Sequence, residues 1–291
     1  MPLSNRYPGL TIRPHPPLLM RLAHRTGRWY RFRQLMSGLG LLHGAAHFPF
    51  HASTVAAPLT EQEAWSYGRL DNYNRATTQS FAAIADRALG TFDLIDCGAH
   101  LGLFGAQVAT FSQGCRRIIA IEPNPEVYPY VEGNLRAGRV TDITTIPAAV
   151  SDFTGHGRLC APDYDPHSDQ ALFLAPDPAG PIAVIRLDSL GDQVGPRLAV
   201  KLDIEGQELA VLQAAADFLR SRERLVLCLE LHENVLARVG QTDRGVLQAI
   251  NAIRPMVWVE ADHPERVLDI SQPILPQTVY RGQCDVVGRD A

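Results

Sequence analysis

The stretch Phe92-Asp93-Leu94-Ile95-Asp96-Cys97-Gly98-Ala99-His100-Leu101-Gly102 decides the fold of this chain. Its first half is a mostly apolar run that ends at Asp96 and is typical of a buried strand in a parallel sheet. A glycine turn follows, and the residues after Gly102 are predicted to form a helix over 103–111. Glycine lets the backbone approach a ligand closely, and a helix start offers free N–H groups. The stretch therefore predicts a ligand-binding corner.

The spacing of the glycines indicates which ligand this corner binds. A dinucleotide fold has the pattern G-x-G-x-x-G around a pyrophosphate, and the turn from Gly98 to Gly102 lacks its middle glycine. Asp96, two residues before Gly98, favours an ammonium group near the turn and repels a pyrophosphate. S-adenosylmethionine carries an ammonium and a sulfonium and no phosphate, so the turn indicates this cofactor.

A second apolar strand, residues 117–122, ends at Glu122 and is followed by the turn Pro123-Asn124-Pro125. A carboxylate at the tip of such a strand can accept both ribose hydroxyls of a nucleoside. Sites for nicotinamide dinucleotides share this feature. Together with Asp96 and the glycine spacing, Glu122 favours S-adenosylmethionine.

The rest of the chain continues an alternation of strands and helices, which predicts an α/β fold with a doubly wound, mostly parallel sheet. We expect residues 1–90 to be a partly helical N-terminal extension and residues 91–291 to be the cofactor-binding domain. Further strands are predicted at 142–150, 182–187, 198–203, 225–230, 256–260 and 284–287, and further helices at 77–89, 126–137, 207–219 and 245–253.

Composition bounds the function. The chain has 291 residues, 46% of them hydrophobic, and a formal net charge of −4, as expected for an ordinary globular protein. Residues 1–60 contain seven arginines and no acidic residue. Such a segment suits a nucleic acid, a membrane surface or an anionic substrate, or is simply a solvated arm. We predict no nucleic-acid partner.

No apolar run is long enough to span a membrane. Five cysteines without a C-x-x-C pair indicate free thiols in a reducing compartment, so we expect a cytoplasmic protein without a signal peptide.

Two histidine-bearing segments are candidates for local function. His43, His47 and His51 recur every four residues and would share one face if this segment were helical, an arrangement that can ligate a metal. Pro49 interrupts the segment and no acid or cysteine is near, so packing or substrate contact is the favoured interpretation. Residues 160–181 are predicted to form a loop, with His167, Ser168 and Asp169 near the site as part of a lid.

The catalytic candidates follow the later strands. Lys201 is the single lysine in a chain with 26 arginines, which suggests that a compact ammonium is needed there; chance is the alternative. Asp203 and Glu205 follow the strand end, and we expect one of them to face the crevice and the other to cap the next helix. His232 or Asp203 can act as the base for a hydroxyl acceptor. Asp203, Glu205 and His232 can instead hold a divalent cation, which we do not favour.

Five motifs in this order resemble the motifs of FkbM-type methyltransferases, over about residues 70–290. The motifs are Ile95-Asp96-Cys97-Gly98-Ala99-His100-Leu101-Gly102, Glu122-Pro123-Asn124-Pro125, Ala149-Val150-Ser151-Asp152, Leu187-Asp188-Ser189-Leu190 and Lys201-Leu202-Asp203-Ile204-Glu205-Gly206-Gln207-Glu208.

The resemblance implies a class I, Rossmann-like fold with a seven-stranded sheet and a transfer of methyl from S-adenosylmethionine to a hydroxyl of a sugar, glycan or secondary metabolite. It implies that Asp96, Gly98 and Gly102 bind the methionine part and Glu122 the ribose, with His100, Asn124 and Ser151 beside them. Asp152 then lies near adenine, although it is equally suited to a turn before Gly155.

The sequence departs from the family at His100, where asparagine is common. Imidazole can still donate one hydrogen bond, but its contact with the cofactor becomes pH-sensitive. Residues 1–70 match no known pattern and are the expected source of acceptor specificity, and a homo-oligomer is possible. Two other functions remain open: a nicotinamide-dependent enzyme, and a methyltransferase-like binding module without turnover.

Overall fold

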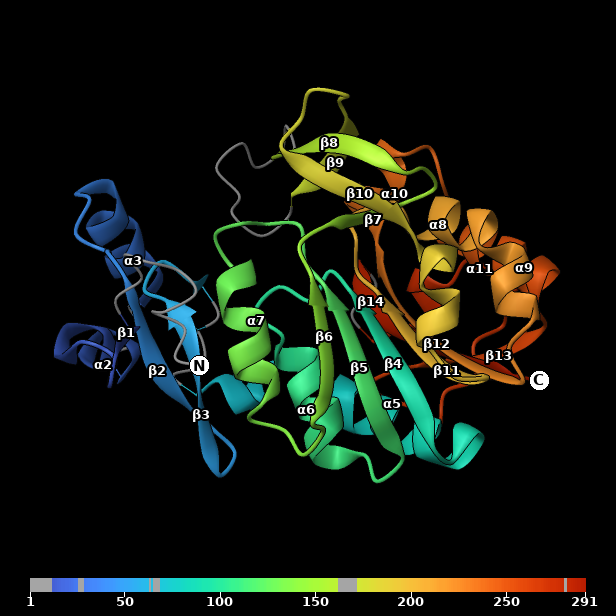
Figure 1. Cartoon of the computed structure of the whole chain (residues 1–291), viewed down its shortest axis with the longest axis horizontal. Coiled ribbons are helices and arrows are strands. Elements are labelled where there is room, and N and C mark those ends of the chain that lie inside the picture. Colours follow the sequence, from blue (N-terminus) through green and yellow to red (C-terminus); the bar gives the residue numbers. More distant parts are fainter. Residues whose placement is uncertain (1–11, 26–28, 63, 65–68, 162–171, 280–281) are drawn as a thin grey trace.

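A seven-stranded sheet is the middle layer of the protein (Figure 1). The computed structural model describes residues 12–25, 29–62, 64, 69–161, 172–279 and 282–291. Strand β14 is antiparallel to both of its neighbours, and all other neighbouring pairs of the sheet are parallel. In spatial order the strands are β13 (Met256–Glu260), β14 (Gln283–Asp290), β12 (Arg224–His232), β11 (Arg197–Leu202), β4 (Phe92–Cys97), β5 (Cys115–Ile121) and β6 (Asp142–Ile146).

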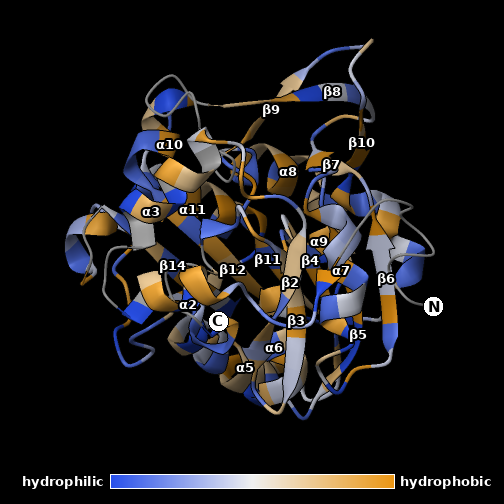
Figure 2. Ribbon diagram, turned by 90° about the vertical axis from the view of Figure 1, so that its left-hand side faces the viewer, coloured by the Kyte–Doolittle hydropathy of each residue, from blue (hydrophilic) through white to orange (hydrophobic). Residues whose placement is uncertain are grey.

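Helices cover both faces of this sheet, which confirms the doubly wound architecture. Leu94 packs into the core cluster under α5 to α7, and its neighbour Ile95 into the cluster on the opposite face. Both faces of β4 are therefore buried, which is why its sequence is a continuous apolar run rather than an alternating one; β11 and β12 are likewise coloured hydrophobic along most of their length (Figure 2). One face carries α5 (Arg75–Leu89), α6 (Leu103–Phe111) and α7 (Tyr128–Leu135); the other carries α8 (Glu208–Ala214), α9 (Ala216–Arg220), α10 (Glu233–Arg238) and α11 (Asp243–Ile253).

A separate four-stranded sheet lies beyond the carboxyl end of β6 (Figure 1). The single strand predicted at 142–150 is wrong: it is split into β6 and β7, because Pro147 has no N–H with which to continue the central ladder. The strand predicted at 182–187 exists but belongs to this small sheet. Its order is β7 (Ala149–Ser151), β10 (Ile182–Arg186), β8 (Gly155–Cys160) and β9 (Phe173–Pro176).

The loop predicted at 160–181 is thus partly strand, since β9 lies within it. The lid residues His167, Ser168 and Asp169 fall outside the described part of the chain. Short 3₁₀ helices complete the fold: η1 (Leu70–Asn72), η2 (Leu187–Gln193) and η3 (Leu275–Gln277).

The described part of the N-terminal region combines helices with a three-stranded sheet. Its first helices are α2 (Leu18–Arg25) and α3 (Trp29–Gly38). The sheet consists of β1 (Ile12–Arg13), β2 (Ala45–Phe50) and β3 (Ser53–Pro58). The spacing of Thr60 and Glu63 is that of a helix capping box, and Glu63 lies outside the described residues.

The histidine segment is a strand and not a helix. His47 lies within β2, and His51 follows it with a φ of 48°. In a strand, residues four apart are separated by about 13 Å. The shared helix face that was considered for a metal at His43, His47 and His51 therefore does not form. Within the described residues, no helix has both the length and the apolar character needed to cross a membrane.

The hairpin of β2 and β3 packs on α6 and α7 through Phe48, Phe50, Leu101 and Leu103, which share one hydrophobic cluster. Asn134 of α7 holds this contact together. Its Nδ2 donates to the carbonyl oxygens of Ala56 (2.8 Å) and Leu101 (2.9 Å), and its Oδ1 accepts from the Ala56 N–H (2.7 Å). The Asn134 side chain thus makes the two hydrogen bonds to Ala56 of β3 that the backbone of a neighbouring strand would make.

We expect Asn134→Ala to lower the free energy of unfolding by at least about 2 kcal/mol, because it leaves buried backbone groups of Ala56 and Leu101 without partners. Chemical denaturation measures this change. The exposed Gln272→Ala is the control and should leave stability nearly unchanged. Equal stability of the two variants would contradict the role given to Asn134.

Candidate functional site

The glycine turn after β4 is pressed against the segment that follows β11. Gly98 has a φ of +75°, and a Cβ at this position would lie 2.0 Å from the Asp203 carbonyl oxygen. Only glycine tolerates both constraints. The N–H groups of Gly98 and Ala99 donate to the Ile121 carbonyl at 3.0 Å, which ties the same turn to the end of β5. The ends of β4, β5 and β11 therefore lie together at Gly98.

Lys201 lies directly beneath this turn. Its Nζ donates to the Gly98 carbonyl (2.9 Å), forms an ion pair with Asp203 Oδ2 (3.0 Å) and lies 3.8 Å from Asp96 Oδ1. Asp96 is 0% exposed and does not line the cavity described below. The ammonium of Lys201 therefore occupies the position beside Asp96 that the sequence assigned to the ammonium of a ligand.

Burial and mutual attraction set the pKa values of this group. Burial raises the pKa of Asp96, and the nearby Lys201 only partly opposes the effect. Burial alone would lower the pKa of Lys201, but Asp203 and Asp96 outweigh it and raise that pKa well above its usual value. Burial likewise favours a neutral Asp203, yet the attraction of Lys201 lowers the Asp203 pKa. Lys201 and Asp203 are thus a charged pair at neutral pH.

Glu122 stands at the end of β5, as predicted, with 5% of its surface exposed. Its Oε2 accepts from the His100 N–H (2.6 Å) and its Oε1 from the Asn124 N–H (2.7 Å). Burial raises its pKa, and His100 and the two backbone donors pull it back down. Each carboxylate oxygen has two lone pairs, so one on each remains for a further donor.

A cavity of about 400 Å³ opens at this point, at the carboxyl ends of the parallel strands. Loops after β4, β5, β11 and β12 form its floor, and the small sheet closes it with Val150, Leu159 and Leu174. Leu159 and Leu174 were not predicted as part of a site, because nothing in their sequence shows that the small sheet folds over the central one. Of the predicted site residues, those that line the cavity are Gly98, His100, Glu122, Asn124, Asp203, Glu205 and His232.

The other predicted site residues do not line the cavity. Ser151 is buried, and its hydroxyl donates to Gln207 Oε1 (3.1 Å) and Asp152 Oδ1 (3.1 Å). Asp152 itself is exposed, which favours the turn interpretation over contact with adenine. Those that do not line the cavity are Asp96, Gly102, Ser151, Asp152 and Lys201.

Five polar lining residues are absent from the predicted site residues: Tyr73, Asn74, Gln207, Glu230 and Gln283. Tyr73 and Asn74 precede α5, inside the region that the sequence placed outside the cofactor domain. Asn74 has a φ of 42°, a left-handed conformation that asparagine adopts more readily than most residues. The sequence Asn72-Tyr73-Asn74 could have indicated a turn at this point. No sequence pattern indicated Gln207 or Gln283 as site residues.

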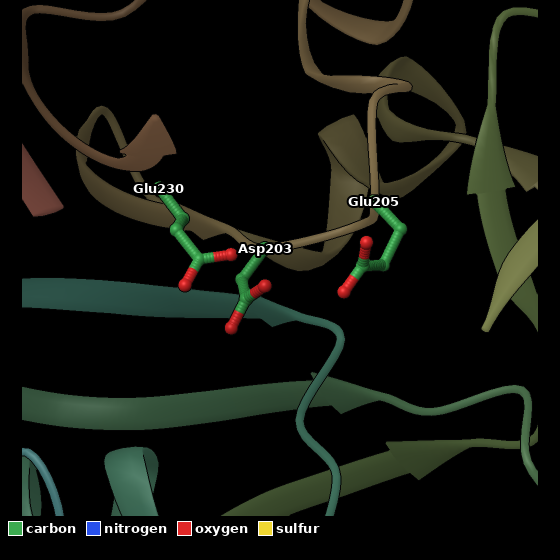
Figure 3. Close-up of side chains that lie close together, drawn as sticks. All are labelled: Asp203, Glu205 and Glu230. Carbon is green, nitrogen blue, oxygen red and sulfur yellow. The ribbon is translucent and has the colours of Figure 1, made fainter. Parts of the chain in front are cut away.

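Three carboxylates converge in the cavity, and the close-up shows Asp203 and Glu230 approaching one another with Glu205 opposite (Figure 3). One oxygen of each lies within 4.8 Å of the others. The expectation that Asp203 and Glu205 face different ways is wrong: residues two apart share a face even in an extended chain, and here both acids line the cavity, with Glu205 in a left-handed conformation (φ of 55°). Glu230, and not His232, completes the group.

Proton uptake limits the charge of this cluster. Burial, followed by repulsion from Asp203, raises the pKa of Glu205 to about 7. Burial and the neighbouring carboxylates Asp203 and Asp285 raise the pKa of Glu230 well above its usual value. Asp203 is the member that stays ionised, and Lys201 balances its charge. Lys201 and proton uptake therefore reduce the negative charge of the cluster.

His100 connects the site to the N-terminal region. Its Nε2 lies 3.2 Å from Glu61 Oε2, and Glu61 is itself 5% exposed. His100 has a φ of 50°, and its backbone N–H is bound by Glu122. Protonation of this imidazole would thus act on the backbone that holds the Glu122 carboxylate.

Comparison with known proteins agrees with this geometry. The family model of the methyltransferase FkbM domain matches residues 96–255. The chain belongs to this family. It is therefore a methyltransferase, and S-adenosylmethionine is supported as its methyl donor. The matched region contains Glu122, Lys201 and the carboxylate cluster, and its fold is the class I methyltransferase fold.

Individual proteins are only distantly similar. TYW2 of M. jannaschii, solved in complex with AdoMet, is 12% identical; the match covers 84% of each chain with a TM-score of 0.42. The N-methyltransferase NodS of Bradyrhizobium japonicum is 11% identical, over 76% of this chain and 97% of that one, with a TM-score of 0.42. No curated protein matches the sequence.

We expect Lys201→Met to lower the free energy of unfolding by about 3 to 5 kcal/mol at neutral pH, since it leaves Asp96 and Asp203 without their cation. The loss should shrink on acidification. Asp96 has a raised pKa in the folded state, so falling pH protonates it there first and removes the unpaired buried charge. Denaturation curves across a pH series measure this effect, with the exposed Arg220→Met as control. A loss that does not depend on pH would contradict the arrangement.

Proposed function

We propose that the protein is an O-methyltransferase that transfers the methyl group of S-adenosylmethionine to a hydroxyl of a small molecule or glycan. The observation that carries this proposal is the cavity itself. It joins Gly98, Glu122 and a proton-accepting side chain, His232, at the carboxyl ends of the parallel strands.

The lining residues fit a nucleoside cofactor that has no phosphate. At Gly98 a Cβ would meet the backbone of the β11 loop, so glycine keeps the floor of the cavity open. The remaining lone pairs of Glu122 suit the two hydroxyls of a ribose. Asp203 and Glu122 would repel a pyrophosphate. This argues against the nicotinamide alternative and agrees with the family assignment.

The bound cofactor supplies an electrophilic methyl group: a C–O bond to the acceptor forms as the S–C bond breaks, and the sulfonium becomes a thioether. The acceptor hydroxyl loses its proton in this reaction. A neighbouring side chain must receive it.

We propose His232 as that base. It follows the end of β12, lines the cavity, and its usual pKa of 6.5 is lowered by burial and by Arg238. Its imidazole is therefore neutral at pH 7 and able to accept a proton. Asp203 is a weaker candidate because its carboxylate forms an ion pair with Lys201. Glu205, with a pKa of about 7, is the second candidate.

Several broader features belong to the same proposal. Residues 1–90 form an extension that contributes to acceptor binding, through Tyr73 and Asn74, and residues 91–291 form the cofactor domain. The reaction needs no divalent cation, because Lys201 already balances the carboxylate cluster. The buried free thiols of Cys97, Cys228 and Cys284 favour the cytoplasm.

We expect S-adenosylmethionine to bind the wild-type protein and to bind Glu122→Ala at least about tenfold more weakly, because charge-assisted hydrogen bonds are lost. Calorimetric titration measures both affinities. Glu126→Ala, which removes an exposed carboxylate from the following turn, is the matched control. Unchanged affinity in Glu122→Ala would remove Glu122 from the cofactor site, and no binding by the folded wild type would overturn the proposed function.

We expect His232→Gln to reduce kcat about a hundredfold while leaving the affinity for S-adenosylmethionine unchanged. Because the pKa of His232 is lowered, the wild-type rate should rise with pH, reach half its maximum below pH 6.5 and then level off. The measurement uses the acceptor found by screening hydroxyl compounds with methyl-labelled cofactor in the presence of EDTA. A midpoint near pH 7 that disappears in Glu205→Gln would assign the base to Glu205 instead.

A further inference from the structure

A second cavity, of about 920 Å³, adjoins the first. It lies between the start of α5 and the ends of β12, β13 and β14 that point toward the site. Asn74, Glu230, His232 and Gln283 line both cavities. The proposed base His232 is therefore at the junction, where a molecule in the second cavity can meet a cofactor in the first.

The second cavity is strongly acidic. Arg75 is the one arginine or lysine among its described lining residues, and its guanidinium lies over the Phe111 ring, 5.8 Å from the ring centre. The positive charge of Arg75 thus lies beside Phe111 of α6. The carboxylates that line the cavity are Glu230, Glu233, Glu260, Asp262 and Asp285.

One of these carboxylates, Glu260, has an oxygen that accepts no hydrogen bond from the described residues. It is 1% exposed, and its Oε1 accepts from the Val279 N–H (2.9 Å). Its Oε2 accepts no hydrogen bond from any described residue and lies 3.9 Å from Arg266 Nε. A buried carboxylate oxygen without a donor is costly, so it is a ready acceptor for a donor on a ligand.

A second group of carboxylates, Asp262 and Asp285, shares one hydrogen-bond donor. The Thr77 hydroxyl lies 2.5 Å from Asp262 Oδ1 and 3.4 Å from Asp285 Oδ2, so one hydroxyl serves two acids. Burial, with repulsion from Asp203, raises the pKa of Asp285 to about 7. A cation placed beside the pair would stabilise both ionised forms.

We propose that this second cavity binds the methyl acceptor, and that the acceptor carries a protonated amine in addition to the hydroxyl that is methylated. The amine binds among Glu260, Asp262 and Asp285, and the hydroxyl reaches His232 at the junction. An amino sugar or another amino alcohol has this chemistry, whereas anionic acceptors are repelled. The inference rests on the proposed function, because it assigns the acceptor of that reaction.

The test compares matched compounds that differ by one amine: D-glucosamine with D-glucose, and ethanolamine with ethylene glycol. Their binding to the full chain is measured by calorimetry in the presence of S-adenosylhomocysteine. We expect the amine to bind at least about tenfold more tightly than its neutral partner in at least one pair. Asp262→Asn and Glu260→Gln, which keep the shape of the side chains, should each reduce that preference severalfold. Asp217→Asn, at an exposed position on α9, should leave it unchanged.

Three results would overturn the inference: equal or tighter binding of both neutral partners, no detectable binding of either amine, or a preference that survives both variants. The affinity for S-adenosylmethionine and the thermal unfolding midpoint are measured on the same samples. Loss of amine preference with normal cofactor binding identifies an effect on the second cavity alone. Loss of cofactor binding in the folded wild type would instead overturn the proposed function.

Discussion

The ion pair between Lys201 and Asp203, with Asp96 close by, is the interaction on which the site depends. A carboxylate as deeply buried as Asp96 is unfavourable without a cation nearby. Lys201 supplies it and also binds the Gly98 carbonyl, so one ammonium joins the ends of β4 and β11 to the glycine turn.

The position of the turn then determines the position of Glu122. Gly98 and Ala99 are bound to the end of β5, and the backbone of His100 donates to the Glu122 carboxylate. The proposed cofactor contact at Glu122 therefore depends on the same glycine turn whose Gly98 carbonyl accepts a hydrogen bond from Lys201. His100 extends this chain of contacts to Glu61, so the N-terminal region is connected to the cofactor cavity by an interaction that varies with the charge of one imidazole.

Acidity divides the site into two parts with different chemistry. In the first cavity, Lys201 and proton uptake by Glu205 and Glu230 keep the charge low, as suits a cofactor that is itself cationic at sulfur. Among the described residues of the second, carboxylates outnumber cations, and Glu260 Oε2 accepts no hydrogen bond from them. The two cavities meet at Glu230 and His232, two positions on the same face of β12. One strand therefore presents both the acid and the proposed base to the place where acceptor and cofactor meet.

The sequence by itself determined the central architecture and the first set of site residues. Strand β4, helix α6, Glu122 and the region of Lys201 and Asp203 were predictable because they depend on local patterns: apolar runs, glycine turns and acids at strand ends. Pro147 could have shown from the sequence alone that the strand at 142–150 is interrupted.

The tertiary structure decided what no local pattern encodes. Asp96 lies below the cavity, Glu205 turns toward Asp203, and the small sheet closes the cavity with Leu159 and Leu174. Glu230 joins the carboxylates in place of His232. These facts depend on contacts between segments far apart in the chain, and on the balance between burial and neighbouring charge that sets each pKa. Such balances exist only after the strands are placed side by side, and that is the reason the sequence could name the residues but not their partners.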